Sequence, residues 1–251
     1  MLEKSKIKNV FFDLDHTLWD FEKNSALTFE KILKPLNIQI ELSEFLHFYD
    51  DFNHKYWKLY RENKISQNTL RQQRLIKTFE AIDYSTTPDL INKLSEQYIE
   101  NLSTFTHLFE GTISVVEYLK KKYTLHIITN GFEVVQHHKI NNSNLSSYFQ
   151  NVFTAEKVGY KKPHPIIFEK ALELSKAIAA ESVMIGDSLE ADVLGAQNAG
   201  MEAIHFNSHH EAEHDHSPVI YNLEEIKRLL WFLRICFHPQ RESFKFAIKW
   251  N

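Results

Sequence analysis

The strongest constraint on the fold is an apolar run that ends at two aspartates one residue apart. Residues 7–12 predict a buried β-strand, and Asp13 and Asp15 follow it directly. Alternate side chains of an extended strand point the same way, so both carboxylates leave the strand end on one side. Apolar strands of this kind are typical of parallel sheets covered on both faces. In open α/β sheets, ligands bind at the carboxyl ends of such strands.

The two carboxylates repel each other unless a cation or a shared proton neutralises them. Mg²⁺ suits such a pair, because it takes hard oxygen ligands, keeps several waters and leaves room for a substrate phosphate. A plain turn after a strand is the competing interpretation, because aspartate also favours turns. Asp13 and Asp15 by themselves leave both interpretations open.

Further stretches favour the catalytic interpretation. Apolar runs over 125–128 and 183–185 end in Thr129-Asn130-Gly131 and Gly186-Asp187, and Lys161-Lys162-Pro163 lies between them. The order and content of these motifs resemble the haloacid dehalogenase-like (HAD) superfamily of phosphohydrolases over residues 7 to about 207. The motifs that carry the resemblance are Asp13-x-Asp15-x-Thr17, Thr129-Asn130, Lys162-Pro163 and Gly186-Asp187-x4-Asp192. Each is weak alone, whereas four in this order form a specific signal.

The resemblance implies a covalent mechanism. Asp13 matches the nucleophile of the superfamily, and a carboxylate can accept a phosphoryl group as an aspartyl-phosphate intermediate. Asp15 would protonate the leaving-group oxygen and then activate the water that hydrolyses the intermediate. The dehalogenases of the superfamily lack this second aspartate, because a halide leaving group needs no proton. Asp15 therefore favours phosphate-ester chemistry.

The resemblance also implies which groups bind the phosphate. Thr129 offers a hydroxyl donor, and the backbone N–H of Asn130 offers a second donor. Lys162 offers a positive charge to the phosphate and to Asp13, although most lysines are solvated surface residues. We choose Lys162 over Lys161 because the lysine of the superfamily directly precedes the proline.

We expect the cofactor Mg²⁺ to be held by Asp13, Asp15 and Asp187. In the superfamily the contact from Asp15 comes from its backbone carbonyl, and Asp187 would bind through its side chain. Asp192 would hold a metal-bound water or Lys162. Glu190 is a further candidate, although an acid in the first turn of a helix is also favoured by the helix dipole.

Apolar spacing divides the chain into a helical part and an alternating part. From Leu18 to about Leu108, apolar residues recur every three or four positions, which predicts several helices. From Gly111 onward helices and strands alternate, which demands a parallel sheet with right-handed crossovers. We expect an α/β fold with a HAD-like Rossmannoid parallel-sheet core over residues 1–17 and 109–235. An all-helical cap over 18–108 would be inserted into this core.

The C-terminal tail over 236–251 falls outside the resemblance. Its large apolar residues occupy alternate positions, namely Phe244, Phe246, Ile248 and Trp250. This spacing predicts an ordered strand over 243–250 that lies on a sheet edge or on a partner subunit. A frayed chain end is the competing interpretation.

Composition excludes several classes of protein. The 251 residues are 43% hydrophobic and 25% charged, which fits a globular protein rather than a disordered one. The net charge of −4 comes without a basic block, so we expect no nucleic-acid partner. No run reaches membrane-spanning length and no signal peptide is evident. Cys236 is the single cysteine, which excludes an intramolecular disulfide and favours a cytoplasmic location. We expect a monomer or a homodimer.

Histidines gather in one region between the last predicted strand and the last predicted helix. They are His205, His209, His210, His214 and His216. A transition-metal site is one interpretation of such a cluster. We favour a solvated loop beside the active-site edge, because no helix sets the spacing of these residues.

Short motifs point to a substrate class. Residues 12–21, residues 128–132 and Asn207 followed by His209-His210 resemble the noncanonical pyrimidine nucleotidases, which release phosphate from nucleoside 5′-monophosphates. A nucleotide site needs an aromatic platform for the base. The candidate platform residues are Trp19, Trp57, Tyr60 and Phe132. Core packing is the competing interpretation for each of them.

Two other activities remain open on the same site. One is a phosphatase for sugar phosphates or other small organic phosphates. The other is a β-phosphoglucomutase-like transferase, in which the phosphoryl group passes to a sugar rather than to water. The mutases of the superfamily carry a basic sugar-binding segment in the cap, and residues 18–108 contain no evident counterpart.

Overall fold

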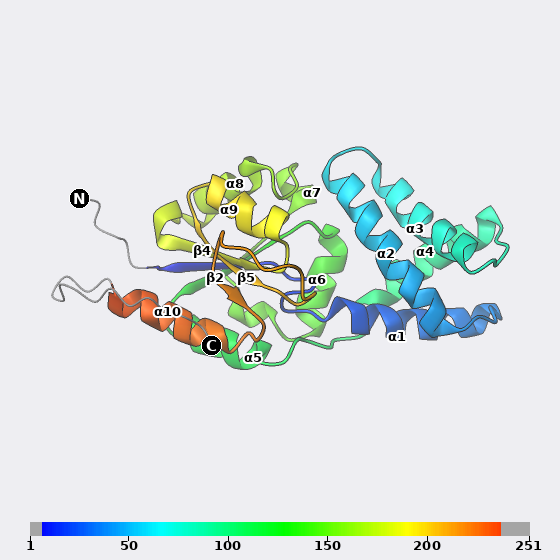
Figure 1. Cartoon of the computed structure of the whole chain (residues 1–251), viewed down its shortest axis with the longest axis horizontal. Helices are drawn as coiled ribbons and strands as arrows, with labels where there is room; N and C mark the ends of the chain where they lie inside the picture. The colour runs from blue at the N-terminus through cyan, green and yellow to red at the C-terminus, as the bar shows by residue number, and fades with distance from the viewer. Residues whose placement is uncertain (1–6, 237–251) are drawn as a thin grey trace.

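The computed structural model describes residues 7–236, with side chains to residue 230. A parallel sheet covered by helices forms one part of the molecule, and a group of helices extends from one end of it (Figure 1). The predicted α/β fold class, with helices inserted after the first strand, is confirmed. None of the described helices combines the length and the apolar character that a membrane crossing requires.

The sheet has six strands in the order β3-β2-β1-β4-β5-β6, and every neighbouring pair is parallel. The strands are β1 Asn9–Phe12, β2 Thr124–Thr129, β3 Asn151–Thr154, β4 Ser182–Gly186, β5 Glu202–Phe206 and β6 Val219–Ile220. β1, β2 and β4 match the apolar runs over 7–12, 125–128 and 183–185, and the two-residue β6 was not expected. β1 lies between β2 and β4, with Phe12 in register with both Ile127 and Ile185. The carboxyl ends of these three strands therefore meet.

Helices cover both faces of the sheet. They are α5 Thr112–Lys120, α6 Glu133–Asn142, α7 Ala155–Val158, α8 Pro165–Ser175, α9 Gly195–Asn198 and α10 Glu225–Cys236. Alternation along β1 separates two apolar cores. Val10 and Phe12 belong to the larger core, whereas Phe11 packs with residues of α8 and α9.

The helical segment that follows β4 begins as a π-helix. Leu189–Leu194 is π-helical and only Gly195–Asn198 is α-helical. π-Helical turns are rare and frequently occur at functional sites. This one carries Asp192, whose place in the candidate site is described below.

Four helices between β1 and α5 form what we call the helical insert. They are α1 Phe21–Leu33, α2 Leu42–Arg61, α3 Gln67–Ala81 and α4 Pro88–Leu102. The side chains of Asp20, Ser66 and Thr87 cap the amino ends of α1, α3 and α4 by accepting a backbone N–H three residues on. The interior of the insert is rich in aromatic side chains, with Phe29 packed against the rings of Phe45, Tyr49 and Tyr98. The exact boundaries of a cap over 18–108 stay a prediction.

The strand predicted over 243–250 lies outside the described residues.

Candidate active site

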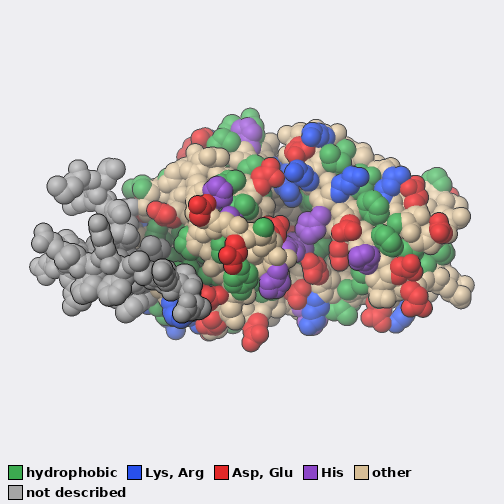
Figure 2. Space-filling view, in the orientation of Figure 1, with side chains coloured by type: hydrophobic (Ala, Val, Ile, Leu, Met, Phe, Trp, Pro, Cys, Tyr) green, Lys and Arg blue, Asp and Glu red, His purple; other side chains and the backbone are tan. Residues whose placement is uncertain are grey.

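The predicted site residues meet at the carboxyl edge of the sheet. Asp13 follows β1, Thr129 ends β2 and Asp187 follows β4. They line one cavity of about 170 Å³, which we call the inner cavity, together with Asp15, Asn130, Lys162 and Asp192. His54, Trp57 and Arg61 of α2 line the same cavity, so it lies between the sheet and the helical insert. Figure 2 shows histidine and acidic side chains gathered over this junction.

Lys162 is buried at the centre of the site. Its Nζ donates to Asp13 Oδ1 and to the carbonyl of Ile128 at 2.8 Å, and pairs with Asp192 Oδ1 at 2.7 Å. Asn130 holds the backbone of Lys162 from both sides. The Asn130 Oδ1 accepts the Lys162 N–H at 2.7 Å, and its Nδ2 donates to the Lys162 carbonyl at 3.0 Å. Lys162, rather than the half-buried Lys161, therefore reaches the candidate nucleophile.

Burial shifts the ionisation of this group of residues. Burial raises the pKa of the Asp13 carboxyl well above its usual range, with Lys162 opposing the rise and Asp192 and Asp187 adding to it. Burial by itself would lower the pKa of Lys162, but the adjacent carboxylates outweigh that effect and raise its pKa. The Lys162 side chain is therefore a fixed positive charge at neutral pH.

The donor set fits a divalent cation. Carboxylate oxygens of Asp13, Asp187 and Asp192 lie within 4.8 Å of one another. Lys162 supplies one positive charge to these three acids, so their ionised forms leave negative charge that a bound cation would neutralise. Hard oxygen ligands at this spacing suit Mg²⁺. The side chain of Asp15 is not part of this group, in keeping with a metal contact through its backbone carbonyl.

Asp15 instead meets two residues of α6. Its Oδ1 pairs with Lys139 Nζ at 2.5 Å, and its Oδ2 accepts Gln136 Nε2 at 2.9 Å. The Gln136 amide also donates to Thr129 Oγ1 at 2.6 Å, and the Gly131 N–H donates to the same oxygen at 3.1 Å. Because Thr129 accepts both bonds, its own hydroxyl proton is left to donate into the cavity.

Sequence reasoning missed Gln136 and Lys139, although a signal was present. The buried face of α6 consists of Val135, Gln136, Lys139 and Ile140. A lysine on the buried face of a helix is unusual unless it is paired. Its position shortly after the Thr129-Asn130 motif would have suggested an acidic partner in the site.

Two glycines permit these close contacts. A Cβ on Gly131 would lie 2.3 Å from Gln136 Nε2, and a Cβ on Gly186 would lie 2.3 Å from the carboxyl carbon of Asp192. Any side chain at either position would displace a polar group of the site.

The predicted aromatic platform is only partly available to a ligand. Trp57 lines the inner cavity and stacks on Phe132, with ring centroids 5.5 Å apart and planes at 29°. Tyr60 meets both rings edge-on and does not line the inner cavity. The expectation that Trp19 contacts the substrate is wrong, because Trp19 is 0% exposed in the apolar core.

The interpretation of the histidines as a solvated loop is wrong for two of them. His205 belongs to β5 and is buried, with its Nε2 2.7 Å from the Asp187 carbonyl. His209 lies between Glu22 and Asp187, at 3.4 and 3.5 Å. Burial opposes protonation of His209, but the nearby carboxylates of Asp187 and Glu22 outweigh that effect and raise its pKa to about 10. The His209 side chain is therefore positively charged at neutral pH, and it links Glu22 of α1 to Asp187 at the edge of the sheet.

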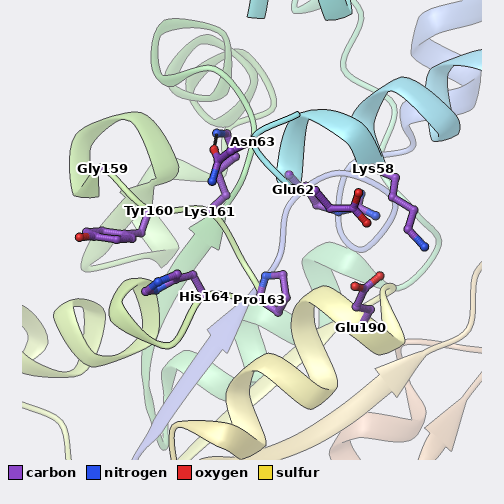
Figure 3. Close-up of a pocket in the computed structure, with 10 residues that line it drawn as sticks. Lys58, Glu62, Asn63, Gly159, Tyr160, Lys161, Pro163, His164 and Glu190 are labelled. Atoms are coloured by element: carbon purple, nitrogen blue, oxygen red, sulfur yellow. Dashed lines mark hydrogen bonds between the residues drawn. The ribbon is translucent and has the colours of Figure 1, made fainter. Parts of the chain in front are cut away.

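A second, larger cavity of about 420 Å³ adjoins the first, and we call it the outer cavity. Figure 3 shows its walls, formed by the end of α2, the loop that carries Lys161 and the turn that carries Glu190. Lys161 donates to Asn63 Oδ1 at 2.6 Å across the cavity rim. Arg61 lines both cavities, and its guanidinium makes no hydrogen bond or ion pair with a described residue. A ligand that occupies both cavities would contact this guanidinium.

Comparison with known proteins identifies the family of the chain. A family model described as haloacid dehalogenase-like hydrolase matches residues 10–206. Pyrimidine 5′-nucleotidase PynA of Streptococcus pneumoniae is 29% identical over 225 residues, which cover 89% of this chain and 93% of that protein. Glyceraldehyde 3-phosphate phosphatase of Methanothermobacter thermautotrophicus is 31% identical, covering 89% of this chain and all of that protein (100%).

Among solved structures, the putative HAD-hydrolase YfnB of Bacillus subtilis, bound to magnesium, matches with a TM-score of 0.82. The two chains are 25% identical, and the match covers 90% of this chain and 99% of YfnB.

Proposed function

The chain belongs to the haloacid dehalogenase-like hydrolases, and from this premise we propose that it is a Mg²⁺-dependent nucleoside 5′-monophosphate phosphatase. That it hydrolyses phosphate monoesters follows from the family and from its phosphatase relatives. The metal and the nucleotide are the proposal. The observation that carries it is the position of Asp13 and Lys162 in a cavity that also has Trp57 in its wall.

The first step forms a covalent intermediate. An oxygen of Asp13 attacks the phosphorus, and the bond from phosphorus to the ester oxygen breaks. Asp15 gives its proton to the departing oxygen, so that the alcohol leaves neutral. Lys162, the Thr129 hydroxyl and the Asn130 N–H offset the charge on the phosphoryl oxygens, which is how proteins accelerate phosphoryl transfer.

The second step releases phosphate. Asp15, now a carboxylate, takes a proton from a water molecule whose oxygen attacks the phosphorus. The bond between phosphorus and Asp13 breaks, and phosphate leaves. Asp192 holds Lys162 in place at 2.7 Å during both steps.

Asp13, Asp187 and the Asp15 carbonyl would hold Mg²⁺, which when bound supplies positive charge to the phosphoryl oxygens and relieves the repulsion among the carboxylates. Removal of Mg²⁺ by a chelator should therefore abolish phosphate release.

The two cavities suit a phosphate with a large leaving group. The inner cavity holds the groups that would bind the phosphate, and the outer cavity of about 420 Å³ has the size of a small-molecule site. Trp57, stacked on Phe132, offers an aromatic face in the wall of the inner cavity, and Arg61, which lines both cavities, offers donors to carbonyl oxygens of a base. The similarity to the pneumococcal pyrimidine 5′-nucleotidase supports the same substrate class.

A phosphatase for small sugar phosphates is the second candidate. The similarity to a glyceraldehyde 3-phosphate phosphatase favours it. Such a substrate would occupy the inner cavity and leave the outer cavity without a role.

A phosphate-release screen separates the two candidates. The purified protein would be assayed with Mg²⁺ against nucleoside 5′-monophosphates, triose and hexose phosphates and p-nitrophenyl phosphate. We expect the largest kcat/KM for a nucleoside monophosphate. A triose or hexose phosphate that exceeds every nucleotide would overturn the nucleotide proposal and retain the phosphatase.

A further inference from the structure

We propose that Lys139 is the positioning residue for Asp15, holding its carboxyl group where it can transfer a proton to the leaving group. This inference rests on the proposed phosphatase mechanism, in which Asp15 is the acid and base. Lys139 belongs to none of the sequence motifs that carry the family resemblance, and it lines neither cavity.

The placement of Lys139 is unusual for a lysine. Its side chain is 2% exposed, and its Nζ lies 2.5 Å from Asp15 Oδ1. The same Nζ sits 4.3 Å above the ring of the buried Trp19. Trp19 thus has a structural role, as the surface on which the ammonium group rests.

Burial of this ammonium group opposes folding. The side chain is desolvated at 2% exposure, and its contact with Asp15 Oδ1 offsets part of the free-energy cost of desolvation. Buried ion pairs are often no more stabilising than apolar residues of the same volume. An apolar side chain would fill this position on α6 at no such cost, so stability alone does not account for the lysine.

Lys139 and Gln136 together fix both oxygens of Asp15. Lys139 contacts Oδ1, and Gln136 donates to Oδ2 at 2.9 Å. Gln136 also bonds Thr129 at 2.6 Å, which ties the orientation of the carboxyl group to a candidate phosphate-binding hydroxyl. The side chain of Asp15 is thereby held at a fixed place beside the phosphate site.

The chemistry of Lys139 and Gln136 leaves the leaving-group oxygen as the acceptor of the Asp15 proton. The ammonium group of Lys139 and the NH₂ group of Gln136 are donors only, so neither accepts a proton from Asp15. A proton on Asp15 is therefore left for the leaving oxygen. When the bond from phosphorus to that oxygen breaks, the oxygen keeps the electron pair and takes the proton. The carboxylate that remains on Asp15 is stabilised by Lys139.

The test compares a poor with a good leaving group. The wild type, Lys139→Met, Lys139→Arg and Asp15→Asn would be assayed with the alkyl phosphate turned over fastest in the screen and with p-nitrophenyl phosphate. An alkoxide needs a proton in order to leave, whereas p-nitrophenolate leaves without one. We expect Lys139→Met to lower kcat for the alkyl phosphate about 10²-fold, the scale of a misplaced catalytic group.

For p-nitrophenyl phosphate, the same variant should change the rate of the first step, measured as the burst of p-nitrophenol, by less than about threefold. Lys139→Arg keeps the charge and should recover most of the loss. A structural role would affect both substrates alike, and Lys170→Met, which removes an exposed lysine of α8, should change neither. If Lys139→Met does not fold, Lys139→Gln carries the same comparison.

Two outcomes overturn the proposal, and they distinguish failure of the Lys139 role from failure of the proposed mechanism. If Asp15→Asn loses alkyl phosphate turnover selectively and Lys139→Met loses both substrates equally or neither, Lys139 does not position Asp15. If Asp15→Asn itself shows no dependence on the leaving group, Asp15 is not the acid and the proposed mechanism fails together with this inference.

Discussion

The sheet edge and the helical insert each bury a positive side chain, and they surround it with different partners. Lys162 at the sheet edge lies between the carboxylates of Asp13 and Asp192. Arg74 in the insert is 3% exposed and bonds the Asn53 Oδ1 at 2.8 Å. Its guanidinium lies 4.9 Å from the ring centroid of Tyr98 and makes no ion pair with a described carboxylate.

The difference separates chemistry from packing. Carboxylates around Lys162 can attack phosphorus, hold a metal or move a proton, so that cluster is reactive. The amide and the rings around Arg74 stabilise its charge through a hydrogen bond and cation–π contacts. These groups neither attack phosphorus nor transfer protons. A buried charge therefore marks a catalytic site only where its partners are themselves reactive.

The largest effect should come from the sheet edge. Asp13→Asn removes the nucleophile while nearly preserving its shape, and should lower phosphate release by roughly 10³- to 10⁶-fold. Asp51→Asn, an exposed position of the insert, is the matched control and should keep the wild-type rate. Release at a near wild-type rate from the Asp13 variant would contradict the covalent mechanism.

Substitutions of Lys162 and Arg74 should separate activity from stability. Lys162→Met should lower kcat by about 10²- to 10³-fold, the usual cost of losing one donor to a developing charge. Arg74→Met should leave kcat within about threefold and lower the free energy of unfolding by about 1–3 kcal/mol. Phosphate-release assays give kcat for both variants, and urea unfolding gives the free energy of unfolding for both. Equal loss of kcat in both would erase the distinction between the two regions.

The insert should matter for substrate binding at the face that meets the site. Trp57→Ala should raise KM for a nucleoside monophosphate about tenfold, the scale of one stacking contact of roughly 1–3 kcal/mol. The KM for p-nitrophenyl phosphate should change less. Tyr60→Ala is the comparison, because Tyr60 supports Phe132 but lines neither cavity. A larger effect from Tyr60 than from Trp57 would place the base elsewhere.

The smallest effect concerns the link between the two regions through His209. Its pKa of about 10 lies above the value of about 6.5 for an unfolded histidine. Because the folded pKa is raised, the contribution of the His209 charge to stability is complete below about pH 6.5 and is lost as the pH rises through 10.

We expect His209→Gln, in buffer with chelator, to lower the Tm by about 2–4 °C at pH 6. At pH 10.5 the melting curves of the wild type and the variant should converge. A Tm difference that stays constant from pH 6 to 10.5 would mean that His209 contributes through packing instead.

Local pattern predicted the elements that carry the chemistry. Strands end where apolar runs end, so the positions of Asp13, Thr129 and Asp187 at strand ends followed from the sequence. A parallel sheet brings its carboxyl ends to one edge, which explains why these residues meet. The choice of Lys162 over Lys161 rested on a motif, and the structure places the Lys162 ammonium group on Asp13.

Partners between elements were not predictable in the same way. Trp19 looked like a platform for a base, yet it is buried in the apolar core. A distant residue helps to hold this segment in place, because the Thr112 hydroxyl donates to the carbonyl of the neighbouring Leu18, 94 positions away. His205 and His209 looked solvated because polar neighbours surround them in sequence. Their actual neighbours, Asp187 and Glu22, come from other elements.

The sequence by itself determined the family, the parallel sheet and the carboxylates at its edge, because these depend on periodicity and on motifs of a few residues. Only the tertiary structure decided that Lys139 and Gln136 hold Asp15, that Trp57 faces the site while Trp19 does not, and that Arg61 joins two cavities. These contacts join residues as far apart as the 124 positions between Asp15 and Lys139. Which side chains meet over such separations is set by how helices pack on the sheet, and no local pattern records it.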